Sequence, residues 1–311
     1  MVRLLEMLAA LLALLALPSE SSGSVGRMGA ELKVVSFNVR YGTADDGENA
    51  WEHRREMVTG LLARLDADVV GLQEALRFQL DEIAPALPGY TEIGVGRDDG
   101  ATLGEYSALL VREERFGIAE SGTFWLSDAP EEPGSKAWGN EITRVCTWAR
   151  LVERTSGRGV YVFNCHLDHK SQPSRERGAE LIAARIGARA HTDEPVVLMG
   201  DFNAGEGNGA MRYLRGELPR ASDAAAWPGH EPAPSPRLID TFRAFHPDAR
   251  EVGTFTGFRV GAINGEKIDH ILAGGGAQVV EAGIDRTSRG GRYPSDHFPV
   301  WARLTLWEDE R

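Results

Sequence analysis

The stretch PVVLMGDFNAGEG, residues 195–207, indicates both a core strand and a polar site at its end. Its apolar run VVLM is typical of a buried strand. The run ends at Gly200, and Asp201, Phe202 and Asn203 then lie in a glycine-rich turn. Alternation along the chain places Asp201 and Asn203 on one side and turns Phe202 toward the core. A core strand that ends in a carboxylate and a carboxamide therefore points to chemistry at its tip.

The composition is that of a soluble globular protein with a sizeable core, at 42% hydrophobic and 26% charged residues. The 311-residue chain carries a formal net charge of −12 and has a sequence pI of about 5.2. This charge argues against loose electrostatic binding to a polyanion, which relies on many Lys and Arg contacts to phosphates. It does not exclude a phosphorylated substrate, because a bound metal can supply positive charge locally.

Residues 1–27 differ from the rest of the chain. Arg3 precedes the apolar run LLEMLAALLALLALP, and a Ser/Gly-rich stretch follows, which is the pattern of a secretory signal peptide. Alternatively, translation starts at Met28 and the leader is an artefact of gene calling. The first interpretation predicts a secreted or periplasmic protein, and the second a cytoplasmic one. The run is short for a membrane span, and no other stretch could cross a membrane, so we expect no stable span.

Many short strand-like runs with few helices favour two mixed β-sheets packed face to face with helices outside. We find no internal repeat and no clean linker in residues 28–311, so we expect one domain there. The Pro-rich segment 224–237 is expected to be an exposed loop. The expected strands are 33–40, 67–75, 90–96, 106–113, 116–126, 142–153, 159–168, 195–201, 253–258, 266–275 and 296–307; the expected helices are about 50–65 with Asn49 as its cap, 76–87 and 174–191.

The two cysteines, Cys146 and Cys165, fall in strand-like runs joined by a short turn. Neighbouring strands would bring them close together, but a domain of this length does not need a disulfide framework. We expect two buried thiols.

Polar residues also mark the ends of other predicted strands. If these tips lie at one edge, they form a crater of carboxylates, amides and imidazoles. Oxygen ligands with few cysteines suit Mg²⁺ or Mn²⁺ rather than structural zinc. Two histidines far apart in the sequence suit a base and an acid. The polar tips are Asn38, Gln73-Glu74, His166, Asp269-His270 and Asp296-His297.

Six motifs in order, FNVR, GLQE, NCHLD, GDFNA, KIDHIL and SDHFPV, resemble those of the endonuclease/exonuclease/phosphatase superfamily, which includes deoxyribonuclease I. Each motif alone is weak, but the set spans about residues 33–303. The resemblance implies a four-layer αββα sandwich of two mixed sheets and metal-dependent cleavage of a phosphate ester. The stretches GVGRDDGATLGEYSALLV and FWLSDAPEEPGSKAWGNEITR look like a bacterial branch of uncharacterised hydrolases.

The resemblance implies a metal site built from carboxylates. Glu74 would be the principal ligand of Mg²⁺, with Mn²⁺ or Ca²⁺ as alternatives; taken alone, Glu74 is more typical of a residue that caps the next helix. Asn38 would touch the metal shell or the phosphate, although Asn is also common in ordinary turns. Asp296 matches a second carboxylate of the metal site.

The same resemblance assigns the acid–base groups. His297 would be the general base that activates water, since an imidazole near neutral pKa does this well. Asp269 would hydrogen-bond His297 and fix its tautomer. His166 would be the general acid or a phosphate contact on the leaving-group side, and Glu105 would orient His166. The alternative for Glu105 is a surface carboxylate. His270 faces away from the site by strand alternation.

The remaining site residues follow from the same motifs. Asp201 and Asn203 would hold the attacking water and a phosphoryl oxygen, and Gly200 would let the substrate approach closely. Arg144 would grip the scissile phosphate, since a guanidinium suits phosphate; the alternative is a surface Arg. Outside this set, the residues that could bind the non-reacting part of the substrate are Arg97, Lys136 and Trp138, and those that either line the rim or lie on the solvated surface are Asp168 and His169.

These observations predict a monomeric, Mg²⁺-dependent hydrolase that cleaves a phosphodiester or phosphomonoester by in-line attack of a His-activated water. The substrate could be a phosphorylated small molecule, a lipid-linked phosphate or a nucleic acid. A non-specific nuclease is therefore the main alternative, although the sequence shows no Lys/Arg cluster for a nucleic-acid backbone. A catalytically inactive binding module is a more remote alternative, because every expected polar position is filled.

Overall fold

Strand β1, Glu31–Asn38, shows how the layers of the molecule form. Its apolar side chains alternate, so that Leu32 and Val34 enter one core cluster whereas Val35 and Phe37 enter another. A strand that is buried on both faces needs cover on both sides. The computed structural model, which describes residues 31–221 and 233–307, provides this cover with a second sheet on one side and helices on the other.

Two six-stranded sheets form the centre of the molecule, in the orders β11-β12-β1-β2-β4-β3 and β5-β6-β7-β8-β10-β9. Each sheet has one parallel pair, β1 with β2 and β7 with β8, and antiparallel pairs elsewhere, so both sheets are mixed. The other strands are β2 Val69–Ala75, β3 Tyr90–Ile93, β4 Tyr106–Arg112, β5 Phe116–Trp125, β6 Val145–Glu153, β7 Gly159–His166, β8 Val196–Asp201, β9 Ile239–Asp240, β10 Asp269–Gly274, β11 Gln278–Ile284 and β12 Val300–Thr305.

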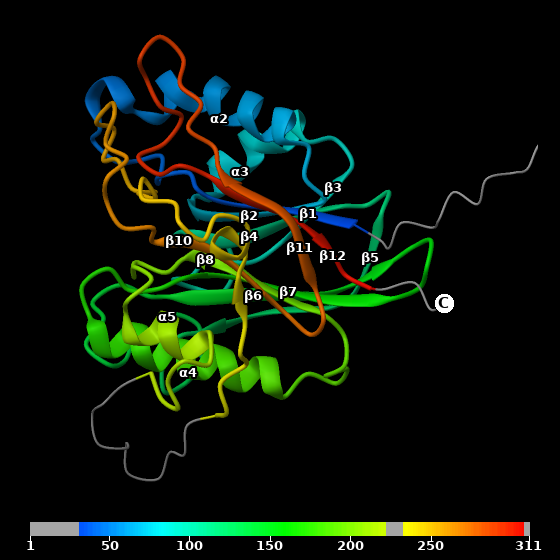
Figure 1. The fold of residues 1–311 in the computed structure, drawn as a ribbon. Coiled ribbons are helices and arrows are strands. Elements are labelled where there is room, and N and C mark those ends of the chain that lie inside the picture. Colours follow the sequence, from blue (N-terminus) through cyan, green and yellow to red (C-terminus); the bar gives the residue numbers. More distant parts are fainter. Residues whose placement is uncertain (1–30, 222–232, 308–311) are drawn as a thin grey trace, which may run out of the picture.

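Helices cover the outer faces of both sheets, which gives four layers (Figure 1). Helices α2 and α3 pack on the outer face of the first sheet, and α4 and α5 pack on the outer face of the second. A third core cluster lies between the sheets. The expected αββα sandwich is therefore confirmed. The helices are α2 Trp51–Leu65, α3 Arg77–Ile83, α4 Gln172–Gly187, α5 Gly209–Leu214 and α6 Thr241–Phe245, with short 3-10 turns η1 Gly47–Asn49 and η2 Ala84–Ala86.

Some local expectations are wrong. Asn49 does not cap a helix: it ends η1, and Ala50 precedes α2 without a side-chain cap bond. The expected strand 253–258 is reduced to a single bridge between Phe255 and His297, because the chain turns there at Gly257. Sequence analysis also missed β9, β11, α5 and α6, which are short or lack a clear apolar period.

Two expectations fall wholly or mostly on residues that the structure does not describe. The leader, residues 1–27, lies outside the described residues, and so does most of the expected loop 224–237; residues 233–237 have no regular structure. Within residues 31–221 and 233–307, no helix is long and apolar enough to span a membrane.

The two cysteines lie opposite each other on β6 and β7. Both Cys146 and Cys165 are free thiols and fully buried, which confirms the expectation. Burial raises the pKa of both thiols, so neither is set up to be a nucleophile.

Gly200 is needed for the close packing of β8 against β7, a role that sequence analysis did not identify. Its φ is +151°, and a Cβ built on it would lie 2.0 Å from the carbonyl oxygen of Cys165 on the neighbouring strand β7. The close approach that requires glycine is therefore between two strands, and not between the strand and a substrate as expected. This packing fixes β8 against β7 directly before Asp201.

We predict that Gly200→Ala lowers the free energy of unfolding by about 3 kcal/mol or more, at the severe end for single substitutions, because backbone atoms must move to admit the methyl group. Chemical denaturation measures the change. Gly207→Ala is the matched control, since a Cβ there meets nothing within 4 Å. Equal stability of the two variants would contradict this account of β8.

Candidate active site

Strand alternation directs most of the expected site residues toward the space between the sheets. On β8, Val197 and Met199 enter the inter-sheet core, so Asp201 continues on the same side. The same continuation holds for Asn38 on β1, His166 on β7 and Asp269 at the start of β10. The apolar core between the two sheets therefore gives way to polar side chains at one end of these strands.

Glu74 reaches the site by a different route. Alternation along β2 would place it on the helix side with Val70 and Leu72. The pairing of β2 with β4 shifts its register between Gln73 and Ala75, which makes Glu74 the extra residue of a β-bulge. Glu74 also has a φ of +63°, which is uncommon for a residue with a side chain. The bulge turns its carboxylate into the pocket.

Asn38 joins the two sheets at the bottom of the site. Its Nδ2 donates to Glu74 Oε1 at 2.9 Å and to Asp201 Oδ2 at 2.9 Å. Its Oδ1 accepts from the backbone N–H of Arg40 at 2.9 Å. The side chain is fully buried, so one amide holds two carboxylates from opposite sheets at fixed positions.

His297 lies among carboxylates. Its Nδ1 is 2.9 Å from Asp269 Oδ2, which is the expected contact, and its Nε2 is 3.7 Å from Asp201 Oδ2. Burial alone would lower the pKa of His297, but the charges of Asp269 and Asp201 raise it well above its ordinary value. Burial, followed by the charge of Asp269, raises the pKa of Asp201 to about 7. This arrangement favours proton uptake by the imidazole.

His166 lies on the other side of Asp201 and has the opposite electrostatic environment. Its Nε2 is 3.5 Å from Asp201 Oδ2 and accepts from Asn203 Nδ2 at 3.0 Å. Burial, followed by the charge of Arg144, lowers the pKa of His166 well below its ordinary value. The imidazole is thus neutral with its hydrogen on Nδ1, and no described residue accepts a hydrogen bond from that Nδ1.

The expected contact from Glu105 to His166 is not formed. Both carboxylate oxygens of Glu105 instead pair with the guanidinium of Arg97, each at 2.7 Å. The two side chains are mostly buried and line the same pocket as His166. Burial raises the pKa of Glu105 to about 7, although the charge of Arg97 opposes this shift. Glu105 is therefore part of the pocket wall as one member of an ion pair.

Arg144 is held by residues that sequence analysis placed at the rim or on the surface. Its Nη2 is 2.9 Å from His169 Nδ1, and its Nε is 3.5 Å from Asp168 Oδ2. Asp168 is 2% exposed, so it is a buried partner of Arg144 rather than a rim residue. The alternative interpretation of Arg144 as a surface residue is excluded, because its side chain is 3% exposed and lines the pocket.

Asp296 lines the pocket beside Glu74. Burial raises the pKa of Asp296, and the charge of Glu74 adds to this shift while His297 and Arg40 oppose it. A carboxyl group that resists ionisation beside a second acidic side chain marks a place where a cation is favourable. Ligand atoms of Glu74, His166 and Asp201 also lie within 4.8 Å of one another.

The pocket has a volume of about 460 Å³, within the range of small-molecule sites. Five lining residues were missed by sequence analysis: Arg40, Tyr41, Ile142, Phe255 and Ile268. Arg40 and Tyr41 directly follow the FNV run, so their position after a polar strand tip was an available signal. Phe255 is 44% exposed and lies 5.0 Å from the His297 ring, between ring centroids.

The other residues considered for substrate binding lie elsewhere. Of Arg97, Lys136 and Trp138, only Arg97 lines this pocket. Lys136 Nζ donates to the backbone of Glu141, and Trp138 packs against the core on the α4 side. His270 faces away from the pocket, as alternation predicted.

Comparison with known proteins is consistent with this geometry. A model of the endonuclease/exonuclease/phosphatase family matches residues 35–297. An endonuclease/exonuclease/phosphatase structure from Bacteroides vulgatus is 30% identical, with a TM-score of 0.76, and the match covers 89% of this chain and 100% of that chain.

A bacterial phosphatase and a viral protein are also similar to this chain. A mannosyl-6-phosphatase from Bacteroides thetaiotaomicron is 32% identical, with a TM-score of 0.74, over 88% of this chain and 99% of that chain. An uncharacterized protein of Acanthamoeba polyphaga mimivirus is 25% identical over 187 residues, which cover 55% of this chain and 67% of that protein.

Proposed function

The chain belongs to the endonuclease/exonuclease/phosphatase family and is a hydrolytic enzyme, and we propose that it is a Mg²⁺-dependent phosphatase for small phosphorylated sugars. The observation that carries this proposal is the group around Asp201. Asn38 binds it from below, and two imidazoles with opposite pKa shifts approach it from either side. Titratable groups whose environments separate their pKa values are typical of acid–base sites.

The family is metal-dependent, and the residues present fit a hard divalent cation. Glu74 would be the principal ligand, with Asp296 and Asn38 beside it, since Mg²⁺ usually takes one or two carboxylates from a protein. The raised pKa of Asp296 beside Glu74 supports this assignment. When bound, the cation supplies positive charge that offsets these carboxylates and polarises the phosphoryl oxygens.

We assign water activation to His297. Asp269 holds its Nδ1, so Nε2 would be the atom that accepts a proton from a water in contact with both the imidazole and Asp201. Asp201 in turn is fixed by Asn38 and by the backbone N–H of Asn203. The attacking oxygen would thus be positioned before the substrate arrives.

We assign the phosphate and the leaving group to the opposite side of Asp201. Asn203 and Arg144 carry the donors for phosphoryl oxygens, and Asp168 and His169 fix the guanidinium of Arg144. His166 contacts the leaving-group side. Its Nε2 carries no hydrogen while it accepts from Asn203, so it would become a donor only after substrate displaces that bond.

The pocket supports a small substrate with hydroxyl groups. Its volume of about 460 Å³ is too small to suggest an extended polymer path. Each oxygen of Glu105 accepts one N–H from Arg97 and keeps capacity for a further donor, such as a sugar hydroxyl. The similarity to a mannosyl-6-phosphatase over most of both chains supports the same substrate class. The net charge of −12 gives no support to the nuclease alternative.

We predict that Glu74→Gln lowers Mg²⁺-dependent turnover at least about a hundredfold, because it removes the negative charge at the proposed ligand. Turnover of a sugar phosphate is measured across a Mg²⁺ titration, with chelator as the blank. Glu52→Gln on the exposed side of α2 is the control and should keep wild-type turnover. Unchanged turnover in Glu74→Gln would exclude this metal site.

We predict that Glu105→Gln raises KM for a sugar phosphate by about tenfold, equivalent to about 1.4 kcal/mol, and leaves KM and kcat for p-nitrophenyl phosphate unchanged. The reason is that the aryl phosphate has no hydroxyl for the Arg97–Glu105 pair. Glu92→Gln, which weakens the Arg77–Glu92 ion pair outside the pocket, is the matched control. Equal loss on both substrates would instead assign Glu105 to the chemistry.

A further inference from the structure

Behind the turn that carries Asp201 and Asn203 lies a buried polar cluster that the proposed chemistry does not use. It consists of Lys267, His270 and Asp240, which are 1%, 1% and 5% exposed. His270 directly follows Asp269 in the sequence, and Lys267 lies just before Ile268 and Asp269. His270 pairs in register with Gly200 of β8. Buried polar groups of this kind are costly unless each has a partner, so their contacts need an explanation.

The contacts of His270 define its tautomer. Its Nδ1 is 2.8 Å from Lys267 Nζ and 3.3 Å from Asp240 Oδ2, and its Nε2 is 3.0 Å from the carbonyl oxygen of Ala204. A carbonyl oxygen can only accept, so Nε2 carries a hydrogen and donates it to Ala204. The ammonium group of Lys267 lies closer to both Nδ1 and Asp240 than these two lie to each other, and it donates to both, so Nδ1 is an acceptor without a hydrogen. Burial, followed by the charge of Lys267, lowers the pKa of His270, which agrees with a neutral ring.

Ala204 directly follows Asn203, so this bond acts on the proposed site. Asn203 has a φ of +47° and donates through Nδ2 to His166 and to the carbonyl of Leu167. The turn is therefore held on the pocket side by the Asn203 side chain and on the core side by His270. The ring of His270 also meets Phe202 edge-on, with 5.5 Å between ring centroids.

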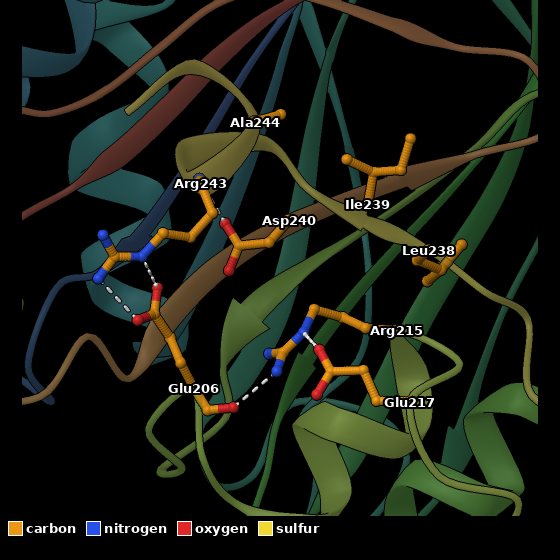
Figure 2. A pocket seen from close by; sticks show the side chains of 8 residues that line it. All are labelled: Glu206, Arg215, Glu217, Leu238, Ile239, Asp240, Arg243 and Ala244. Carbon is orange, nitrogen blue, oxygen red and sulfur yellow. Dashed lines mark hydrogen bonds and ion pairs between the residues drawn. The ribbon is translucent and has the colours of Figure 1, made fainter. Parts of the chain in front are cut away.

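Carboxylates surround the ammonium group of Lys267. Its Nζ is 2.6 Å from Asp240 Oδ2 and 3.3 Å from Glu206 Oε1. Glu206 in turn forms a two-pronged ion pair with Arg243, at 2.7 and 2.8 Å. Figure 2 shows Glu206, Asp240 and Arg243 gathered on one side of a surface pocket. The chain of contacts thus runs from this surface to the back of the turn.

We propose that His270 is a positioning residue, which fixes the turn of Asp201 and Asn203 from behind through a single ring tautomer set by Lys267. This inference rests on the proposed hydrolysis, because its effect is read at that site. It requires that loss of the Nε2 donor disturb kcat more than KM or stability. KM should change little, because the residues proposed to bind the rest of the substrate, Arg97 and Glu105, bind each other and are not among the hydrogen-bond partners of His270.

The test compares His270→Phe with His270→Gln in the full chain. His270→Phe keeps the ring against Phe202 but removes the donor, and kcat should fall about tenfold or more with KM within about twofold. His270→Gln offers a replacement donor and should recover most of kcat. His246→Phe is the matched control: His246 Nε2 also lies 2.9 Å from a backbone carbonyl, that of Ala282, away from the pocket, and kcat should not change. Wild-type kcat in His270→Phe overturns the proposal.

A second measurement keeps the proposal testable if His270→Phe fails to fold. The ¹⁵N chemical shifts of the His270 ring in the wild-type protein should show a protonated Nε2 and a bare Nδ1, and the opposite tautomer overturns the proposal. A wild-type protein with this tautomer but without activity on any phosphate ester contradicts the proposed function, and not the tautomer. A wild-type protein that is active, with equal kcat losses in His270→Phe and His270→Gln, contradicts the positioning role alone.

Discussion

The amide of Asn38 is the contact on which the rest of the site depends. It comes from the first sheet and donates both hydrogens, one to Glu74 of the same sheet and one to Asp201 of the other. Without it, the half-buried carboxylate of Glu74 and the buried carboxylate of Asp201 would face each other across the sheets with no shared donor, which is unfavourable where water is scarce. The amide therefore fixes the distance between the proposed metal ligand and the proposed water-binding carboxylate.

From this fixed centre, the two imidazoles acquire different properties through their neighbours. His297 is surrounded by carboxylates and gains affinity for a proton, whereas His166 loses it through burial and through the charge of Arg144. The residues are the same in type, so the assignment of base and leaving-group contact follows from environment alone. Strand β7 positions the ring of His166, whereas His297 lies shortly before β12 and is held by an isolated bridge to Phe255 and by Asp269.

The part of the site that follows strand alternation could be predicted from the sequence. Asp201 and Asn38 continue apolar faces of period two, and the resemblance in six motifs added the pairing of Asp269 with His297. Glu74 could not be placed by alternation, because a β-bulge reverses its side. The sequence also could not show that Glu105 pairs with Arg97 rather than with His166, because this depends on distances between side chains in the folded chain.

The fold could be predicted because its strands are long and apolar, while short elements such as β9 and α6 carry too few residues for a period to appear. The account is tested most directly by the turnover of His297→Ala at saturating Mg²⁺, with Mg²⁺ affinity measured on the same protein. The account predicts a loss of about 10²- to 10⁴-fold in kcat with metal affinity unchanged, because a base is removed and not a ligand. Weakened metal binding with little loss of kcat would contradict it.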